Sequence, residues 1–339
     1  MAVSALKRPA GGPAVFAPVE LAPGLFLART RVPVAIRIVN LYLLRSRDGW
    51  VLFDCGTDSE TTFTSLTSTL GSIGIAMRDL RMIIVTHCHA DHVGMAQTLR
   101  QLSGAELVVH MPTISWVQRL YGPYADRRED VERLARSHGL PSDEIDDLHE
   151  FNRRHSGWGH VGPYDRVVSD ADQIEAGEFK FRVIATPGHA PDHMCLHAEQ
   201  QGWLFAGDHL LRNITPHVGF NDPMLEDPLG DFEASLHRMS ALATTLVLAG
   251  HGTPFTDAGE RSTAVIKHHE HRAEKVRSIV RHQALSAFQV TRLLFGRRQL
   301  SHDQRHLAFT ETLAHLEYLR RRGVVNASDR DGLVVYQAA

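Results

Sequence analysis

The sequence predicts an α/β fold in which strands and helices alternate, followed by a smaller helical domain. Short apolar runs recur through residues 23–260, several ending in turns that contain glycine, and this alternation is typical of layered α/β domains. The charge also changes along the chain, because residues 267–339 carry a net charge of +6 and the remainder −9. We therefore expect a loose lead-in at 1–22, a main domain at 23–260 and a C-terminal domain at 261–339.

The individual elements are predicted from the spacing of apolar residues. Residues 113–160 are rich in charged side chains and poor in strand signals, so we expect a mostly helical insertion that could act as a lid. Helices are expected at 59–71, 95–102 and 231–242. Strands are expected at 24–28, 36–44, 50–53, 81–85, 106–110, 167–168, 179–184, 194–197, 203–206 and 245–248.

The last part of the chain has a different pattern. Helices are expected at 264–283, 287–295 and 302–322, and Gly323 is a suitable residue to end the last one. Two short β runs then flank a polar turn that contains Gly332, which indicates a hairpin. Three helices followed by a hairpin predict a winged-helix-like domain.

The composition excludes several classes of protein. The chain has 339 residues, of which 43% are hydrophobic and 22% charged, so a globular protein with a sizeable core is expected. Three cysteines cannot form a disulfide framework, and no apolar run reaches the length of a membrane helix. We expect a cytoplasmic protein with no membrane partner. The 22 histidines indicate metal chemistry, proton chemistry or only a polar surface.

A dense group of candidate ligands follows the strand predicted at 81–85. It consists of His87, His89, Asp91 and His92. Imidazole and carboxylate groups are suitable ligands for zinc. Four such residues in six positions are more than one tetrahedral ion with an open site can use, so this spacing predicts two neighbouring metal ions.

Three isolated polar residues occupy similar places further along the chain. His189, Asp208 and His251 each follow an apolar strand and a turn containing glycine, and glycine allows tight turns and close backbone approach. If the strand ends meet at one rim of a sheet, seven candidate ligands would lie together.

The motifs THCHADH, TPGHAPDH, GDH and GHG occur in the same order as in the metallo-β-lactamase superfamily, which the chain resembles over about 19–257. The resemblance implies a four-layered αβ/βα sandwich with metals at one edge. It also implies that one ion is held by His87, His89 and His189, the other by Asp91, His92 and His251, and that Asp208 bridges them. Two Zn²⁺ ions are expected, although Fe or Mn tolerate the same ligands.

The resemblance also implies roles for residues around the ligands. A hydroxide shared by two ions would attack the substrate, with Asp91 or Asp208 accepting its proton. Asp54 matches the first aspartate of the family and is expected to orient a ligating histidine. Three residues after Asp208 are expected to line the site or contact the substrate: His209, Arg212 and His217. A surface loop fits Arg212 and His217 equally well.

The substrate is left open between two enzyme classes. The TPGHAPDH motif and the C-terminal segment resemble the branch typified by β-lactamase-like protein 2, a ribonuclease with a small winged-helix-like C-terminal domain. A small-molecule ester, thioester or lactone is the first expectation, and RNA is the alternative that the basic C-terminal domain favours. A DNA-binding regulator is a minor third alternative. The oligomeric state is not predicted, and a homodimer is compatible with the sequence.

Overall fold

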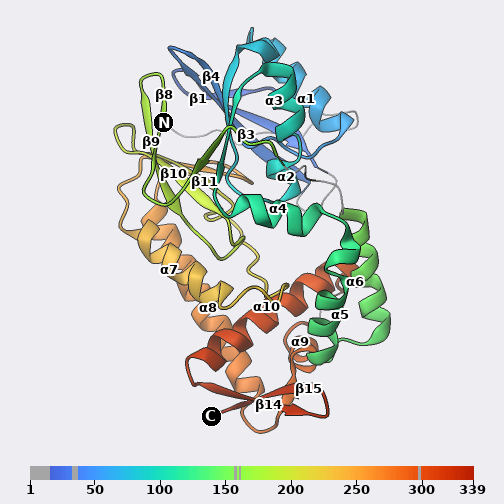
Figure 1. Cartoon of the computed structure of the whole chain (residues 1–339). Coiled ribbons are helices and arrows are strands. Elements are labelled where there is room, and N and C mark those ends of the chain that lie inside the picture. The colour runs from blue at the N-terminus through green and yellow to red at the C-terminus, as the bar shows by residue number, and fades with distance from the viewer. Residues whose placement is uncertain (1–15, 33–36, 156–158, 160–161, 297–298) are drawn as a thin grey trace.

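Two β-sheets face each other in the upper part of the molecule, with helices on their outer faces (Figure 1). The structure, a computed structural model, describes residues 16–32, 37–155, 159, 162–296 and 299–339, with the side chains of 154 and 155 left out. The layers run helix, sheet, sheet, helix, which confirms the predicted αβ/βα sandwich.

The strands of each sheet are hydrogen-bonded in a simple order. Within the described residues, the first sheet runs in chain order through β1 (Val19–Ala22), β2 (Leu25–Arg31), β3 (Ile38–Ser46), β4 (Gly49–Phe53), β5 (Leu80–Ile84), β6 (Glu106–His110) and β7 (Arg166–Val168). The second sheet runs in reverse chain order through β12 (Leu246–Ala249), β11 (Trp203–Gly207), β10 (Met194–Ala198), β9 (Phe179–Ala185) and β8 (Gln173–Ala176).

Alternating side chains of the strands fill the layers between and outside the sheets. In β4, Val51 and Phe53 face the second sheet, whereas Leu52 faces the outer helices, as expected for a strand buried on both faces. Phe53 stacks on Phe205 of β11 with ring centroids 3.7 Å apart, so the two sheets are in direct contact. The helices of the first outer layer are α1 (Glu60–Ser72) and α3 (Ala96–Ser103), and η1 (Met77–Asp79) precedes β5.

The helix α8 (Ala258–Ile279) connects the sandwich to the C-terminal region. Val265 packs with the second sheet and with α7 (Pro228–Ser240), whereas Val276 lies in the C-terminal core. The helix begins at 258 rather than at the expected 264, because the Asp257 side chain accepts a hydrogen bond from the backbone N–H of Glu260. The expected domain boundary at 260/261 therefore falls inside one continuous helix.

The C-terminal region contains α9 (Ala287–Phe295), α10 (His302–Arg321) and a small antiparallel sheet. In that sheet, β15 (Leu333–Ala338) pairs with both β14 (Val325–Arg330) and β13 (Leu285–Ser286). The expected terminal hairpin is therefore present as β14 and β15. The winged-helix comparison itself remains a prediction.

The helical insertion shares its core with this C-terminal region. It comprises α4 (Thr113–Tyr121), η2 (Tyr124–Asp126), α5 (Arg128–Ser137) and α6 (Ser142–His155). Val131 of α5 and Leu148 of α6 belong to the same buried cluster as Leu313 of α10 and Tyr336 of β15. In Figure 1 the insertion's last two helices stand beside α9 and α10, below the sandwich. The insertion is thus part of a second core, and its role as a lid stays a prediction.

Several short elements differ from the expectation. Residues 19–22 form β1 although a loose lead-in is expected there, and β8, β13 and α2 (Ala90–Val93) are not among the expected elements. These elements have two to four residues, which is too short for apolar periodicity to identify. Within the described residues, no helix has both the length and the apolar character needed to cross a bilayer.

We expect Leu313→Ala to lower the free energy of unfolding by about 2–5 kcal/mol, because the side chain is fully buried in the shared C-terminal core. Urea unfolding followed by circular dichroism measures this change. Leu293→Ala on α9 is the matched control, since that side chain is 62% exposed, and it should shift the midpoint little. Equal midpoints for the two variants would contradict the shared core.

Candidate metal centre

The seven candidate ligands lie together beyond the ends of four strands, five of them in loops and Asp91 and His92 in the short helix α2. His87, His89, Asp91 and His92 follow β5, and His189 lies between β9 and β10. Asp208 follows β11 and His251 follows β12. The strands belong to two facing sheets, so the expectation of one rim of a single sheet was wrong. The centre forms where the edges of both sheets meet.

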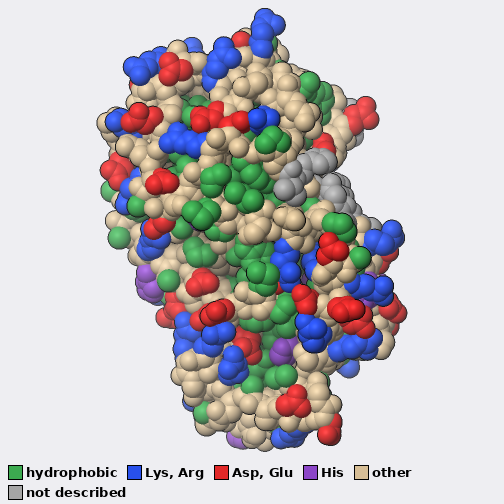
Figure 2. All heavy atoms as spheres, in the orientation of Figure 1, with side chains coloured by type: hydrophobic (Ala, Val, Ile, Leu, Met, Phe, Trp, Pro, Cys, Tyr) green, Lys and Arg blue, Asp and Glu red, His purple; other side chains and the backbone are tan. Residues whose placement is uncertain are grey.

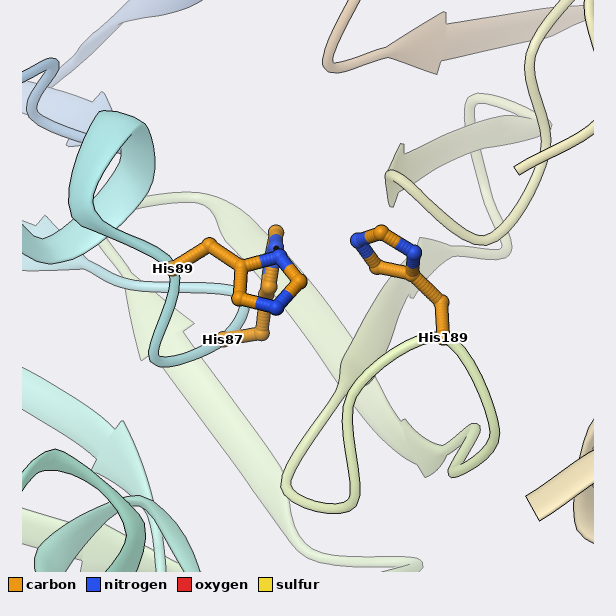
Figure 3. Close-up of side chains that lie close together, drawn as sticks. All are labelled: His87, His89 and His189. Carbon is orange, nitrogen blue, oxygen red and sulfur yellow. Dashed lines mark hydrogen bonds between the residues drawn. The ribbon is translucent and has the colours of Figure 1, made fainter. Parts of the chain in front are cut away.

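Three histidines form one compact group. Figure 3 shows the rings of His87 and His89 on one loop facing the ring of His189 on another. One nitrogen from each ring lies within 4.8 Å of the others, and His87 Nε2 is 3.0 Å from His89 Nδ1. Three neutral imidazoles at such distances can bind one divalent ion.

A second group lies beside the first. Asp91, His92 and His251 also bring ligand atoms within 4.8 Å of one another, and His251 Nε2 is 3.4 Å from Asp91 Oδ2. Asp208 lies between the groups, because its Oδ2 is 3.5 Å from His189 Nε2 and 3.2 Å from His251 Nε2. His87, His92 and Asp208 form a further group within the same limit, and the assignment of ligands to two ions stays a prediction.

The donor set fits divalent metal ions. His92 Nε2, His189 Nε2 and Asp208 Oδ1 are buried, and no hydrogen-bond partner is present for them among the described residues. Such buried polar atoms are costly unless something binds them. Nitrogen and oxygen donors pointing at a common space are suited to zinc, iron or manganese.

Electrostatics leave the two groups in different protonation states before metal binds. Burial lowers the pKa of His89 to about 3, so this imidazole is neutral and offers a lone pair. Burial opposes charge on Asp91, but His92 and His251 still lower its pKa to about 2. Burial also disfavours protonation of His251, yet Asp208 and Asp91 raise its pKa to about 10. The carboxylates therefore attract positive charge, which a metal ion can supply.

The second ring nitrogen of four candidate ligands is held by an oxygen atom. His87 Nδ1 lies 3.0 Å from Thr86 Oγ1. His92 Nδ1 lies 2.8 Å from Asp54 Oδ2. His189 Nδ1 donates to the carbonyl of His217 at 2.7 Å, and His251 Nδ1 to that of Ile38 at 2.6 Å. These contacts fix each tautomer so that Nε2 faces the centre.

Asp54 has the orienting position that the sequence predicted. Its carboxylate also accepts hydrogen bonds from the backbone N–H of Thr86, at 2.8 Å, and from the Thr86 hydroxyl, at 3.0 Å. Its backbone has φ = 60°, a conformation that costs energy for a residue with a side chain and is often found at functional sites. Asp54 thus connects the end of β4 to the loop of His87 and His92.

Two glycines allow the loops to approach closely. A Cβ at Gly250 would lie 2.3 Å from Asp208 Oδ1 and 2.8 Å from His92 Cε1. A Cβ at Gly207 would lie 2.7 Å from His193 Nε2, at φ = 46°. Glycine at both positions is therefore required by the packing around Asp208.

Several supporting residues were missed or only partly anticipated from the sequence. His193 Nε2 accepts a hydrogen bond from the backbone N–H of Asp208 at 3.1 Å, and Thr186 Oγ1 lies 2.7 Å from His193 Nδ1. Asn40 and Tyr42 of β3 donate to the carbonyl of Ala249, just before His251. Thr186 and His193 are the two ends of the TPGHAPDH motif, whereas nothing in the local sequence distinguishes Asn40 and Tyr42 from ordinary core residues.

Two of the three residues expected near the substrate do not line the cavity beside the centre. His209 is fully buried with its ring 5.0 Å from that of Phe232, and it does not line the cavity beside the centre. Arg212 is exposed and hydrogen-bonds to Thr253 at 3.3 Å, also away from that cavity. Thr253 lies two residues after His251, so Arg212 is beside the loop of a candidate ligand and the surface-loop interpretation fits it. His217 does line the cavity.

A cavity of about 320 Å³ adjoins the metal centre. His89, Asp91 and His189 line it on the side of the sandwich. Its other walls come from the insertion, the 217–225 loop and α10, and they are mostly apolar; they include Trp116, Leu120, Leu134, Leu148, Phe220 and Phe309. This volume is within the range of small-molecule sites.

The comparisons with curated proteins give relatives over most of the chain. Probable metallo-hydrolase YqjP of Bacillus subtilis is 26% identical over 312 residues, covering 91% of this chain and 95% of the relative. A beta-lactamase-like protein 2 homolog of Caenorhabditis elegans is 24% identical, with 78% and 73% covered. Thioesterase pkgB of Emericella nidulans is 23% identical, with 77% and 59% covered.

Solved structures and family models indicate the same family of proteins as these relatives. A beta-lactamase domain protein from Burkholderia ambifaria superposes with a TM-score of 0.85 at 30% identity, covering 97% of this chain and 96% of that one. A metallo-beta-lactamase family protein from Thermus thermophilus gives 0.81 at 30% identity, with 94% and 100% covered. Residues 273–339 match the metallo-beta-lactamase-like C-terminal domain. Residues 35–251 match the metallo-beta-lactamase superfamily model, and the chain belongs to that superfamily.

Proposed function

We propose that this metal-dependent hydrolase uses two metal ions to cleave small-molecule acyl esters or thioesters. The observation that carries the proposal is the apolar cavity beside the metal centre. Its walls are suited to an acyl chain, and it opens directly on His89, Asp91 and His189. The similarity to a fungal thioesterase supports the same class of substrate.

The proposed ligand assignment follows the two groups of side chains. His87, His89 and His189 would hold one ion and Asp91, His92 and His251 the other, with Asp208 shared. Bound ions would lower the pKa of a water molecule and polarise the substrate carbonyl. Zinc is the expected metal, and iron or manganese would accept the same donors.

The protein's own groups position the reactants and the proton. Asp91 lines the cavity and its side chain is 13% exposed, so its carboxylate can accept the proton of the attacking water. Asp208 has a similar charge but is held between His189 and His251. The apolar walls exclude bulk water from the acyl group, which strengthens electrostatic interactions in the site.

An endoribonuclease is supported less well by the surface. Many cations of the basic C-terminal region are already paired with carboxylates. On the face seen in Figure 2, Lys and Arg side chains are interspersed with Asp and Glu. RNA binding requires several cations free to contact phosphates. The paired cations are Arg272 with Glu311, Arg305 with Glu144, Arg320 with Glu317 and Arg322 with Asp227.

Replacing His87 or Asp208 by Ala should abolish ester or thioester turnover and lower the bound metal, since each removes a ligand from the centre. Metal content by plasma mass spectrometry and hydrolysis of a p-nitrophenyl ester measure both effects. His271→Ala, which changes an exposed histidine of α8, is the matched control. Full activity in a metal-free His87→Ala protein would contradict the mechanism.

Asp54→Asn should reduce metal affinity or activity by about 10–100-fold, because His92 loses its anionic partner at 2.8 Å. Metal titration with a competing chelator measures the affinity. Asp48→Asn is the control, as that carboxylate is exposed and its nearest cation, Arg47, is 3.8 Å away. Asp54 has no orienting role if both variants bind metal as the wild type does.

Salt dependence separates the two substrate classes. Hydrolysis of a neutral acyl thioester should change little when salt rises from about 50 to 200 mM, whereas RNA cleavage by a protein that makes about 6–10 phosphate contacts would weaken by about 10³–10⁵-fold. Rates with octanoyl thioester and with a labelled RNA, measured over the same salt series, test this. RNA turnover with no thioester turnover would overturn the proposed function.

A further inference from the structure

We propose that Arg127 binds a carboxylate at the far end of the substrate's acyl chain, so that the preferred substrates are ω-carboxyacyl thioesters or esters. This inference rests on the proposed function and names the substrate class of the same site. It is carried by a buried guanidinium in an otherwise mostly apolar cavity.

Arg127 is unusually buried for an arginine. The residue is 8% exposed and lines the cavity at the start of α5. Its Nη2 donates to Asn152 Oδ1 at 2.7 Å and to the carbonyl of Leu120 at 3.4 Å, and its guanidinium lies 5.2 Å from the centre of the Tyr124 ring. Its Nε is buried with no hydrogen-bond partner among the described residues.

Among the described residues, no direct partner of Arg127 carries an opposite charge, and the nearby carboxylate of Asp222 attracts its guanidinium only from farther away. Within the described part of the chain, no carboxylate lies within 4.0 Å of its guanidinium nitrogens. The cavity's own carboxylate in this region, Asp222, is bound by Arg119 at 2.5 Å, and Asp130 lies 3.2 Å from Arg119 as well. A buried charge with no opposite charge in direct contact is costly, so an anionic ligand that contacts the guanidinium would stabilise the site.

The position of Arg127 indicates which part of a substrate it would meet. The cavity is lined by the metal centre on one side and by α5, α6 and α10 on another. Arg127 directly precedes α5 and donates a hydrogen bond to Asn152 of α6, and in Figure 1 α5 and α6 stand apart from α2. An acyl carbonyl at the metal centre would thus leave the chain among apolar side chains and its far end near the guanidinium.

A matched pair of substrates tests the proposal. Octanoyl and suberoyl thioesters have the same number of carbons and differ only in a terminal methyl or carboxylate. The wild type should hydrolyse the suberoyl thioester with a kcat/KM about 10–100-fold higher, the range expected for a charged hydrogen bond. Arg127→Met should lose this preference, and Arg127→Lys should keep part of it.

Arg133→Met is the control, because Arg133 lies on α5, which begins directly after Arg127, with its side chain 68% exposed. This variant should keep the wild-type preference. A wild type that prefers the octanoyl thioester overturns the proposal whatever the variants do. An unchanged preference in Arg127→Met also overturns it.

Product binding distinguishes failure of this inference from failure of the proposed function. If neither thioester is hydrolysed, the proposed function fails, and calorimetry with suberate and octanoate still tests Arg127. The inference then requires Arg127→Met or Arg127→Lys to weaken suberate binding at least about 10-fold and to leave octanoate binding unchanged. Equal weakening of both acids, or no suberate binding to the wild type, contradicts it.

Discussion

The structure depends most on the contact between two sheets that brings buried carboxylates and imidazoles together. Phe53 and Phe205 hold the sheets in contact beside the site. Asp54, the residue after Phe53, then connects to Thr86 and His92. Hydrogen bonds within the protein orient these loops, which is the preorganisation that catalysis by charge stabilisation requires. Asp91 and Asp208 repel each other, and both attract a proton to His251. Bound cations would relieve this repulsion and take the place of the proton.

The second core determines what the metal centre can act on. The insertion and the C-terminal helices pack together through residues such as Val131 and Leu316. One side of this core closes the cavity that opens on His89 and His189. A link also runs from α10 to the centre, because Thr310 Oγ1 lies 3.3 Å from His217 Nε2 and the carbonyl of His217 holds His189. The C-terminal region is therefore part of the site rather than an appended module.

Much of the sandwich could be predicted from the sequence because its strands are continuous apolar runs. The strand at 106–110 and the helix at 287–295 have the expected bounds. The candidate ligands could be found because each has a distinctive side chain at a strand end. The short strands β1 and β8 could not, since they contain too few residues to show a period.

Contacts between distant parts of the chain could not be predicted from the sequence. The partnership of Asn40 with the loop before His251 spans 209 residues, and nothing nearby marks it. His209 shows the opposite error, because adjacency to Asp208 in sequence suggested a place in the site whereas its side chain packs on Phe232. The core shared by the insertion and the C-terminal helices was also missed, because it depends on packing between segments that are far apart in the sequence.

The most direct test of the central claim is anomalous X-ray scattering at the zinc edge from crystals grown with zinc. The account predicts two peaks, one among His87, His89 and His189 and the other among Asp91, His92 and His251, with Asp208 contacting both. A single peak, or zinc bound at another place with these side chains free, would contradict it.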